Sequence, residues 1–144
     1  MDITEAVHAA KVLARTGALH PVRPDRILRM AAAYRHWGVS LAAGFATTAA
    51  HYGERPAAVD ERGTISFREL DARSDALARA LAHVGLRAGD SVGVLCRNHR
   101  YLLEISGALS KAGIHAVYMN TGFSAPQLRQ VYQRERAIAL VHDD

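Results

Sequence analysis

Over the first third of the chain, apolar side chains recur at the three- and four-residue intervals of a helix. The first predicted helix starts at Asp2 and Glu5, which have the spacing of a capping box, and ends near Gly17. Its apolar stripe consists of Ile3, Val7, Ala10 and Leu13. A glycine after the last turn is a common helix stop, so this pattern predicts one short amphipathic helix.

Two further helices are predicted before residue 54. One begins at Pro24, because the missing N–H of proline suits a first turn, and it ends at Gly38. Its predicted apolar stripe consists of Ile27, Ala31 and Tyr34, with Leu28 and Met30 beside it. The next runs from Leu41 to His51 and is capped by Ser40. Residues 1–53 are therefore predicted to form a helical lead-in.

From residue 54 onward, strand patterns alternate with helix patterns. Strands are predicted at 57–59 and 64–65, around a tight turn, and at 91–96, 115–119 and 138–141. The helices between them start at two capping boxes, Ser66 with Glu69 and Ser124 with Gln127, and after the loop at 97–99, where Asn98 is the expected cap. Strands alternating with helices at this spacing predict right-handed crossovers. The predicted fold class is α/β, with residues 54–144 forming the first βα units of a mainly parallel, helix-covered sheet.

The last predicted strand has no helix after it, since the chain ends at Asp143-Asp144. Parallel strands are normally covered on both faces. We therefore expect residues 1–144 to be the front part of a larger protein. A piece with an open sheet edge is also expected to self-associate.

Composition changes this picture little. The hydrophobic fraction of 49% and the charged fraction of 22% are typical of a globular protein, and the net charge of +4 is modest. The single cysteine, Cys96, excludes an internal disulfide and fits a cytoplasmic location. An acidic start and the lack of a long apolar run predict neither a signal peptide nor a membrane-spanning segment.

Catalytic motifs are missing from the sequence. There is no phosphate-binding Gly-x-x-x-x-Gly-Lys-Ser/Thr loop and no Gly-x-Gly-x-x-Gly after a strand. No pattern of cysteines or histidines has the spacing of a metal site. We therefore predict no catalytic residue and no metal ligand in this chain.

One loop is a candidate anion-binding site: Arg97, Asn98, His99 and Arg100. It follows a parallel strand and opens a helix, which is where open α/β sheets bind ligands and where helix N-termini attract anions. The alternative is a solvated loop in which Asn98 only caps the helix.

The predicted helix 24–37 is basic, with Arg26, Arg29, Arg35 and His36 between its apolar residues and Arg23 just before it. Such a helix can lie on a membrane surface. The alternative is a helix that packs on the sheet domain with its basic face in water. Nucleic acid is not expected as a partner, because no recognition motif accompanies the charge.

Four blocks in order resemble the adenylate-forming superfamily. They are Arg55-Pro56-Ala57-Ala58-Val59-Asp60 with Gly63-Thr64-Ile65-Ser66-Phe67-Arg68-Glu69-Leu70, then Gly85 to Val92, then Ala108 to Gly113, then Asn120. Within the superfamily, residues 96–100 and 120–124 are most similar to fatty-acyl-CoA synthetases of actinobacteria.

This resemblance implies a parent enzyme that is an acid–thiol ligase. Such enzymes join a carboxylate, here a fatty acid, to ATP with Mg²⁺ as an acyl-adenylate, and then transfer the acyl group to coenzyme A. The catalytic loop and lysine of the family lie beyond residue 144, so the resemblance implies that this piece alone is inactive. Lys111 belongs to the Lys-Ala-Gly block, where a structural role is expected. The alternative is a non-catalytic interaction module, or one that associates peripherally with membranes.

Overall fold

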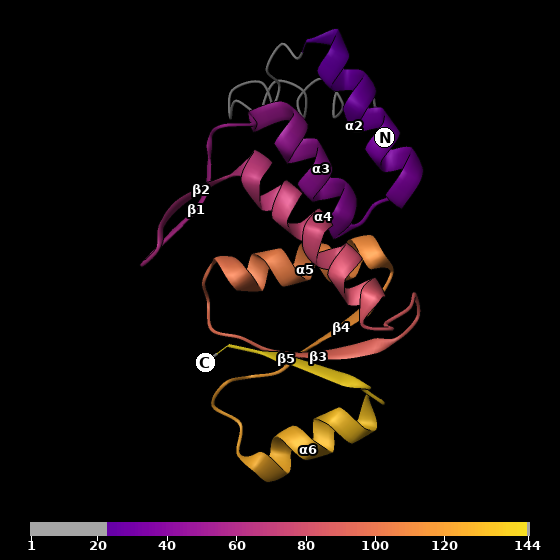
Figure 1. Ribbon diagram of the computed structural model, residues 1–144, viewed down its shortest axis with the longest axis vertical. Helices are drawn as coiled ribbons and strands as arrows, with labels where there is room; N and C mark the ends of the chain where they lie inside the picture. The colour runs from indigo at the N-terminus through magenta and orange to yellow at the C-terminus, as the bar shows by residue number, and fades with distance from the viewer. Residues whose placement is uncertain (1–22, 144) are drawn as a thin grey trace, which may run out of the picture.

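The computed structural model describes residues 23–143, and its elements form stacked layers (Figure 1). The helical layer contains α2 (Pro24–Trp37) and α3 (Leu41–Tyr52). A hairpin of β1 (Pro56–Asp60) and β2 (Gly63–Ser66) then leads into α4 (Phe67–His83). The first predicted helix, at residues 2–17, lies outside the described residues.

The sheet that follows is parallel and has the strand order β4-β3-β5. It is built from β3 (Ser91–Leu95), α5 (Arg100–Ala112), β4 (His115–Tyr118), α6 (Ala125–Arg134) and β5 (Ala139–His142). Because β4 and β5 lie on opposite sides of β3, right-handed crossovers must place α5 and α6 on opposite faces. Figure 1 shows this arrangement, with α5 and α4 on one face and α6 on the other. The predicted α/β class and parallel sheet are confirmed.

The core lies between β3 and the helices α4 and α5. Val92 and Val94 of β3 are fully buried against Ile105 and Leu109 of α5 and Leu81 of α4. The opposite face of β3 is lined closely by other strands and loops: a Cβ on Gly93 would come within 2.9 Å of both Leu140 and Met119. Glycine therefore lets the apolar side chains of that face close over the central strand.

The predicted helix starts and stops are largely confirmed. Both capping boxes form, with Ser66 and Glu69 opening α4 and with Ser124 and Gln127 opening α6. Ser40 caps α3 by accepting a hydrogen bond from the N–H of Ala43. At α5 the expected cap is wrong: the ring of His99, not Asn98, accepts the N–H of Tyr101.

The apolar stripe predicted for α2 is not the face that the helix buries. Ala33 is buried on the side of α2 that faces α3, whereas Ile27 and Tyr34 of the predicted stripe are 53% and 48% exposed. Arg26 also lies on the α3 side, because its guanidinium donates to the carbonyl of His51 at 2.7 Å. The less exposed positions of α2 are Arg26, Met30, Ala33 and Trp37, which share one face at helical intervals and differ from the predicted stripe by about one position.

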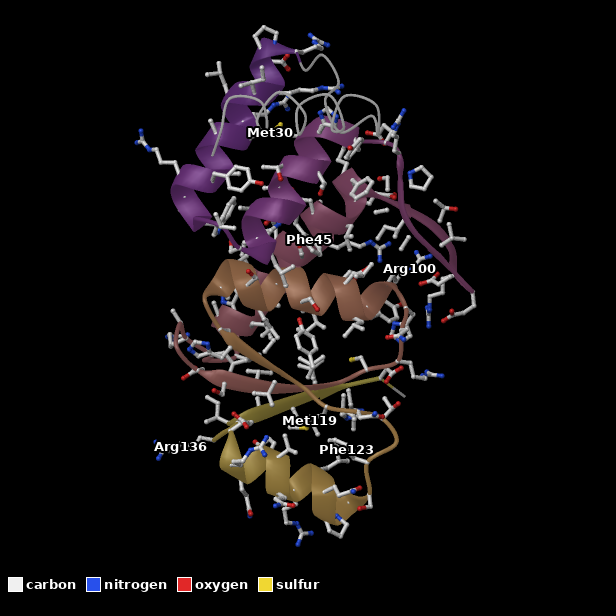
Figure 2. The ribbon with its side chains drawn as sticks, turned by 180° about the vertical axis from the view of Figure 1, so that it is seen from behind. Met30, Phe45, Arg100, Met119, Phe123 and Arg136 are labelled. Atoms are coloured by element: carbon white, nitrogen blue, oxygen red, sulfur yellow. The ribbon has the colours of Figure 1, made fainter. Side chains whose placement is uncertain are left out.

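Helix α3 packs against α4 and α5, across the boundary predicted between residues 53 and 54. The N–H of Ala42 donates to the hydroxyl of Ser110, and Phe45 covers the backbone at Gly107 (Figure 2). That two-part division stays a prediction. Lys111 has the structural role expected of it: its buried ammonium joins α5 to α4 through the carboxylates of Asp71 and Asp75.

The second face of the sheet is only partly covered. Helix α6 lies over it but buries none of its own residues, and Leu140 of the edge strand β5 is 44% exposed. Two residues after the end of α6, Arg136 has a left-handed backbone (φ 52°), and its N–H donates to the carbonyl of Gln133. Among the described helices, none is both long and apolar enough to cross a bilayer.

Candidate functional site at the carboxyl edge of the sheet

The carboxyl ends of β3, β4 and β5 meet at one edge, because the three strands are parallel. Their loops bring together residues 96–99 after β3, residues 119–122 after β4, and Asp143 after β5. Parallel sheets bind ligands at this edge. It is also where the sequence placed its candidate anion site.

The chain leaves β3 toward α5 on one face of the sheet and leaves β4 toward α6 on the other face (Figure 1). Neighbouring strands whose connections diverge in this way are where open α/β sheets form a binding crevice. A hollow of about 570 Å³ lies there. Its walls are Val94, Cys96, Arg97, Asn98, Leu102, Tyr118, Met119, Asn120 and Thr121. The volume is in the range of small-molecule sites. Its polar groups suit a ligand with hydrogen-bonding oxygens.

A second hollow, of about 340 Å³, lies on the β5 side of Arg97. Cys96, His99 and Asp143 line it. The Nε2 of His99 lies 2.8 Å from the Asp143 carboxylate, while its Nδ1 accepts the N–H of Tyr101. Nε2 therefore carries the proton, and the neutral ring has no nitrogen left to take a proton from the thiol. Burial, with a smaller contribution from the charge of Asp143, raises the pKa of Cys96. This hollow is thus not a cysteine–histidine nucleophile site.

The four residues of the predicted anion loop have different positions. The guanidinium of Arg100 is buried beneath the hairpin and bound to Asp60, with Nε 2.8 Å from Oδ2 (Figure 2). Arg97 binds Asp143 at 2.6 Å, but its side chain remains 66% exposed. His99 is buried in its contact with Asp143, and Asn98 lines the crevice. Internal carboxylates therefore already neutralise much of the positive charge of this loop.

The two carboxylates in these pairs are strongly acidic. Hydrogen bonds from Arg100 hold the pKa of Asp60 well below its usual range. Hydrogen bonds from Arg97, and next from His99, lower the pKa of Asp143 in the same way. Sequence reasoning missed both aspartates as partners of the loop. Asp60 was noted only as the last residue of the block at 55–60, and its partner Arg100 is 40 positions away.

A Mg²⁺ site is not found within residues 23–143, where no group of three or more His, Cys, Asp or Glu side chains converges. Asp60 and Asp143 are the carboxylates closest to the predicted loop, and arginine holds each of them. Mg²⁺ prefers unpaired carboxylate oxygens together with water. The described residues therefore do not supply the metal chemistry that the resemblance implied.

Comparison with known proteins identifies the family to which this fold belongs. Residues 45–144 match the family model of the AMP-binding enzyme. Over 93 residues the chain is 33% identical to the AMB antimetabolite synthetase AmbE of Pseudomonas aeruginosa. This matched region covers 64% of the chain and 4% of AmbE. Over 90 residues it is 32% identical to a 2-succinylbenzoate–CoA ligase of Bacillus cereus, covering 62% of this chain and 19% of the ligase.

Among solved structures, the N-terminal subdomain of Klebsiella oxytoca NpsA superposes with a TM-score of 0.69 at 26% identity. The match covers 73% of this chain and 28% of that one. The chain thus spans only a small part of each relative. The family match extends over most of the chain, and the described fold matches part of an N-terminal subdomain. The chain belongs to the family of AMP-binding, adenylate-forming enzymes.

Proposed function

We propose that this chain is the first part of an AMP-forming acid–thiol ligase. The observation that carries the proposal is the match of residues 45–144 to the AMP-binding enzyme family, on a fold like the NpsA N-terminal subdomain. In the proposed reaction, a carboxylate oxygen attacks the α-phosphorus of ATP, and pyrophosphate leaves. The thiol of coenzyme A then attacks the acyl carbon, and AMP leaves. In the parent enzyme, Mg²⁺ would balance the phosphate charge.

The proposal places the chemistry outside this part of the chain. Three ionisable side chains of the described residues, those of Lys111, His99 and Arg100, are held in structural contacts. The Lys111 ammonium is bound by two carboxylates, both ring nitrogens of His99 are used, and Arg100 is held by Asp60. None of these is positioned as a nucleophile or general base. Residues 1–144 alone are therefore proposed to be inactive and to contribute the crevice wall between β3 and β4.

The acyl substrate that we propose is a fatty acid, on the strength of the local resemblance at residues 96–100 and 120–124. An aryl carboxylate is the second candidate. It is favoured by the similarity to a 2-succinylbenzoate–CoA ligase, and by the NpsA subdomain, whose structures include a complex with 3-hydroxybenzoyl-AMSN. Both candidates use the same acid–thiol chemistry and differ only in the acyl group.

The test is pyrophosphate release from ATP by the full-length product and by residues 1–144. The acid panel contains medium- and long-chain fatty acids, 2-succinylbenzoate and 3-hydroxybenzoate, with and without coenzyme A. Release by the full-length protein that depends on a fatty acid, and none by the short piece, is the expected result. Release only with an aryl acid replaces the substrate class. Acid-dependent release by the short piece would falsify the proposal that residues 1–144 alone are inactive.

The same proposal has consequences for the cellular location of the parent enzyme and for the association of residues 1–144. We propose a cytoplasmic parent enzyme in which further elements cover the outer edge of β5. Without them, residues 1–144 should dimerise through this edge, where Leu140 and Ile138 are 44% and 60% exposed. Light scattering at tens of micromolar would show a dimer or larger species. A monodisperse monomer would contradict the exposed-edge argument.

A further inference from the structure

The crevice between β3 and β4 offers hydrogen-bond donors and no carboxylate among its described lining residues. Four of these residues carry donor groups: Arg97, Asn98, Asn120 and Thr121. The Oδ1 of Asn120 accepts the N–H of Gly122 at 2.8 Å, so the NH2 group of Asn120 is the end that can face a ligand. A phosphate group, with its terminal oxygens, can accept from several of these donors at once. The chemistry of the crevice therefore favours a phosphate bound on Arg97.

The hollow on the other side of Arg97 does contain carboxylates. Glu61, Glu104 and Asp143 line it, and Arg97 is part of its wall as well. The Nε of Arg97 lies 2.6 Å from Oδ2 of Asp143. The guanidinium of Arg97 thus lies at the boundary between a hollow whose described lining is partly acidic and a crevice whose described lining is not.

The carboxylate of Asp143 has a second side chain to hold it. The Nε2 of His99 donates to the same Oδ2 at 2.8 Å, and the side chain of His99 is only 8% exposed. If the guanidinium of Arg97 turns away, Asp143 therefore keeps a buried donor and its place at the end of β5. The Arg97 side chain is 66% exposed, and ion pairs of such exposed groups contribute little to stability. Exchanging this ion pair for another one is thus inexpensive.

We propose that a phosphate group in the β3–β4 crevice and the carboxylate of Asp143 compete for the guanidinium of Arg97. Without a ligand Arg97 pairs with Asp143, and with a phosphate in the crevice the guanidinium turns to the phosphate. Asp143 therefore sets how tightly the crevice binds anions. By linkage, a bound phosphate loosens the contact between the end of β5 and the loop after β3. The inference rests on the crevice being an anion site, and it holds or fails independently of the proposed ligase reaction.

The first test is calorimetric titration of the 144-residue chain with inorganic pyrophosphate at low salt. Asp143→Asn should raise the affinity about two- to fivefold, the range that corresponds to an exposed ion pair. An asparagine at this position can still accept from His99, so the fold should be retained, which thermal unfolding checks. In an Arg97→Gln background, Asp143→Asn should leave the affinity unchanged. A lower affinity in Asp143→Asn would mean that Asp143 positions Arg97 for the anion, which overturns the competition.

The matched control is Glu61→Gln, which removes the same charge from the same hollow. Glu61 lies at the exposed turn of the hairpin, and its effect on Arg97 acts through space. Glu61→Gln should therefore change the affinity much less than Asp143→Asn. Equal gains in the two variants, or a gain from Asp143→Asn that persists in the Arg97→Gln background, would reduce the effect to overall charge and overturn the proposal.

The second test follows the Arg97 side chain directly by NMR with ¹⁵N-labelled arginine. The Nε–H signal of Arg97 is identified by its loss in Arg97→Gln. Pyrophosphate should shift this signal to saturation, and Asp143→Asn should shift it before any pyrophosphate is added. The Nε–H signal of Arg100, which is bound to Asp60, is the internal reference. Binding of pyrophosphate that leaves the Arg97 signal in place, or no binding in any variant, overturns the proposal.

Discussion

Arg100, the first residue of α5, holds the carboxylate of Asp60 at the end of β1. The Nε of Arg100 lies 2.8 Å from Oδ2 and 3.0 Å from Oδ1 of Asp60, and Nη2 also donates to the carbonyl of Gly63 at 2.8 Å. The backbone N–H of Arg100 donates to the same carboxylate at 3.0 Å. One side chain thus joins the β1–β2 hairpin to the helix that opens at the carboxyl edge of the sheet.

Removing this ion pair should destabilise the chain in a way that depends on pH. The lowered pKa of Asp60 means that its contribution is present above the unfolded value, near pH 4, and is lost as the pH falls through the folded value. Asp60→Asn should therefore lower the melting temperature by several degrees at pH 7 and by only somewhat less at pH 3, and the effect should shrink further as the pH falls below 3. Thermal unfolding followed by circular dichroism at both values measures this.

The matched control is Glu54→Gln, which breaks the exposed pair with Arg68. It should leave the melting temperature nearly unchanged at either pH. A similar loss in Glu54→Gln and Asp60→Asn would show that the hairpin does not depend on the Arg100 contact.

Close contact between α3 and α5 makes Gly107 hard to replace. A Cβ there would lie 2.7 Å from Cε1 of Phe45 and 3.0 Å from Cβ of Ser74. Gly107→Ala should therefore destabilise the chain by about 1–3 kcal/mol, the usual cost of overfilling a core. Urea unfolding provides the free energy of unfolding.

Gly44 offers the opposite case on the facing helix. A Cβ at Gly44 would have no neighbour within 4 Å, so Gly44→Ala should stabilise the chain by about 0.4–1 kcal/mol. If both substitutions change the stability in the same direction, the helices do not approach each other as described.

The predicted anion site at residues 97–100 can be tested with inorganic pyrophosphate. Arg100 is buried on Asp60, whereas Arg97 binds Asp143 but keeps 66% of its side chain exposed and lines the crevice, so any binding should depend on Arg97. Arg97→Gln should weaken pyrophosphate binding several-fold in calorimetric titrations at low salt. Arg79→Gln, on the exposed side of α4, is the control. Equal affinities in the two variants would remove the loop as an anion site.

The thiol of Cys96 should react slowly at neutral pH. Burial and the charge of Asp143 raise its pKa, so less thiolate is present at a given pH than for an ordinary cysteine. Alkylation by iodoacetamide should accelerate as the pH rises above 9, and Asp143→Asn should increase the rate at pH 8. Ala72→Cys with Cys96→Ser supplies an exposed reference thiol. A faster reaction at Cys96 than at this reference would contradict the environment described for it.

Local signals in the sequence were enough to locate most helices and strands. The capping boxes at Ser66 and Ser124 mark the first turns of α4 and α6, and the left-handed Gly113 marks the end of α5. Each of these signals acts over only a few residues. The wrong cap at α5 is also local: Asn98 and His99 are adjacent, and only the observed loop backbone brings the ring of His99 to the N–H of Tyr101.

By itself, the sequence determined the α/β class, the order of the elements, the superfamily and the edge of the sheet at which the candidate loop lies. These depend on periodicity, turn chemistry and the handedness of crossovers, all of which act over short stretches of chain. Only the tertiary structure decided which face of α2 is buried and which carboxylates hold Arg97 and Arg100. Those outcomes depend on side chains some 40 residues apart in sequence, such as Asp60 and Arg100, whose meeting is set by how the hairpin, the helices and the sheet fit together.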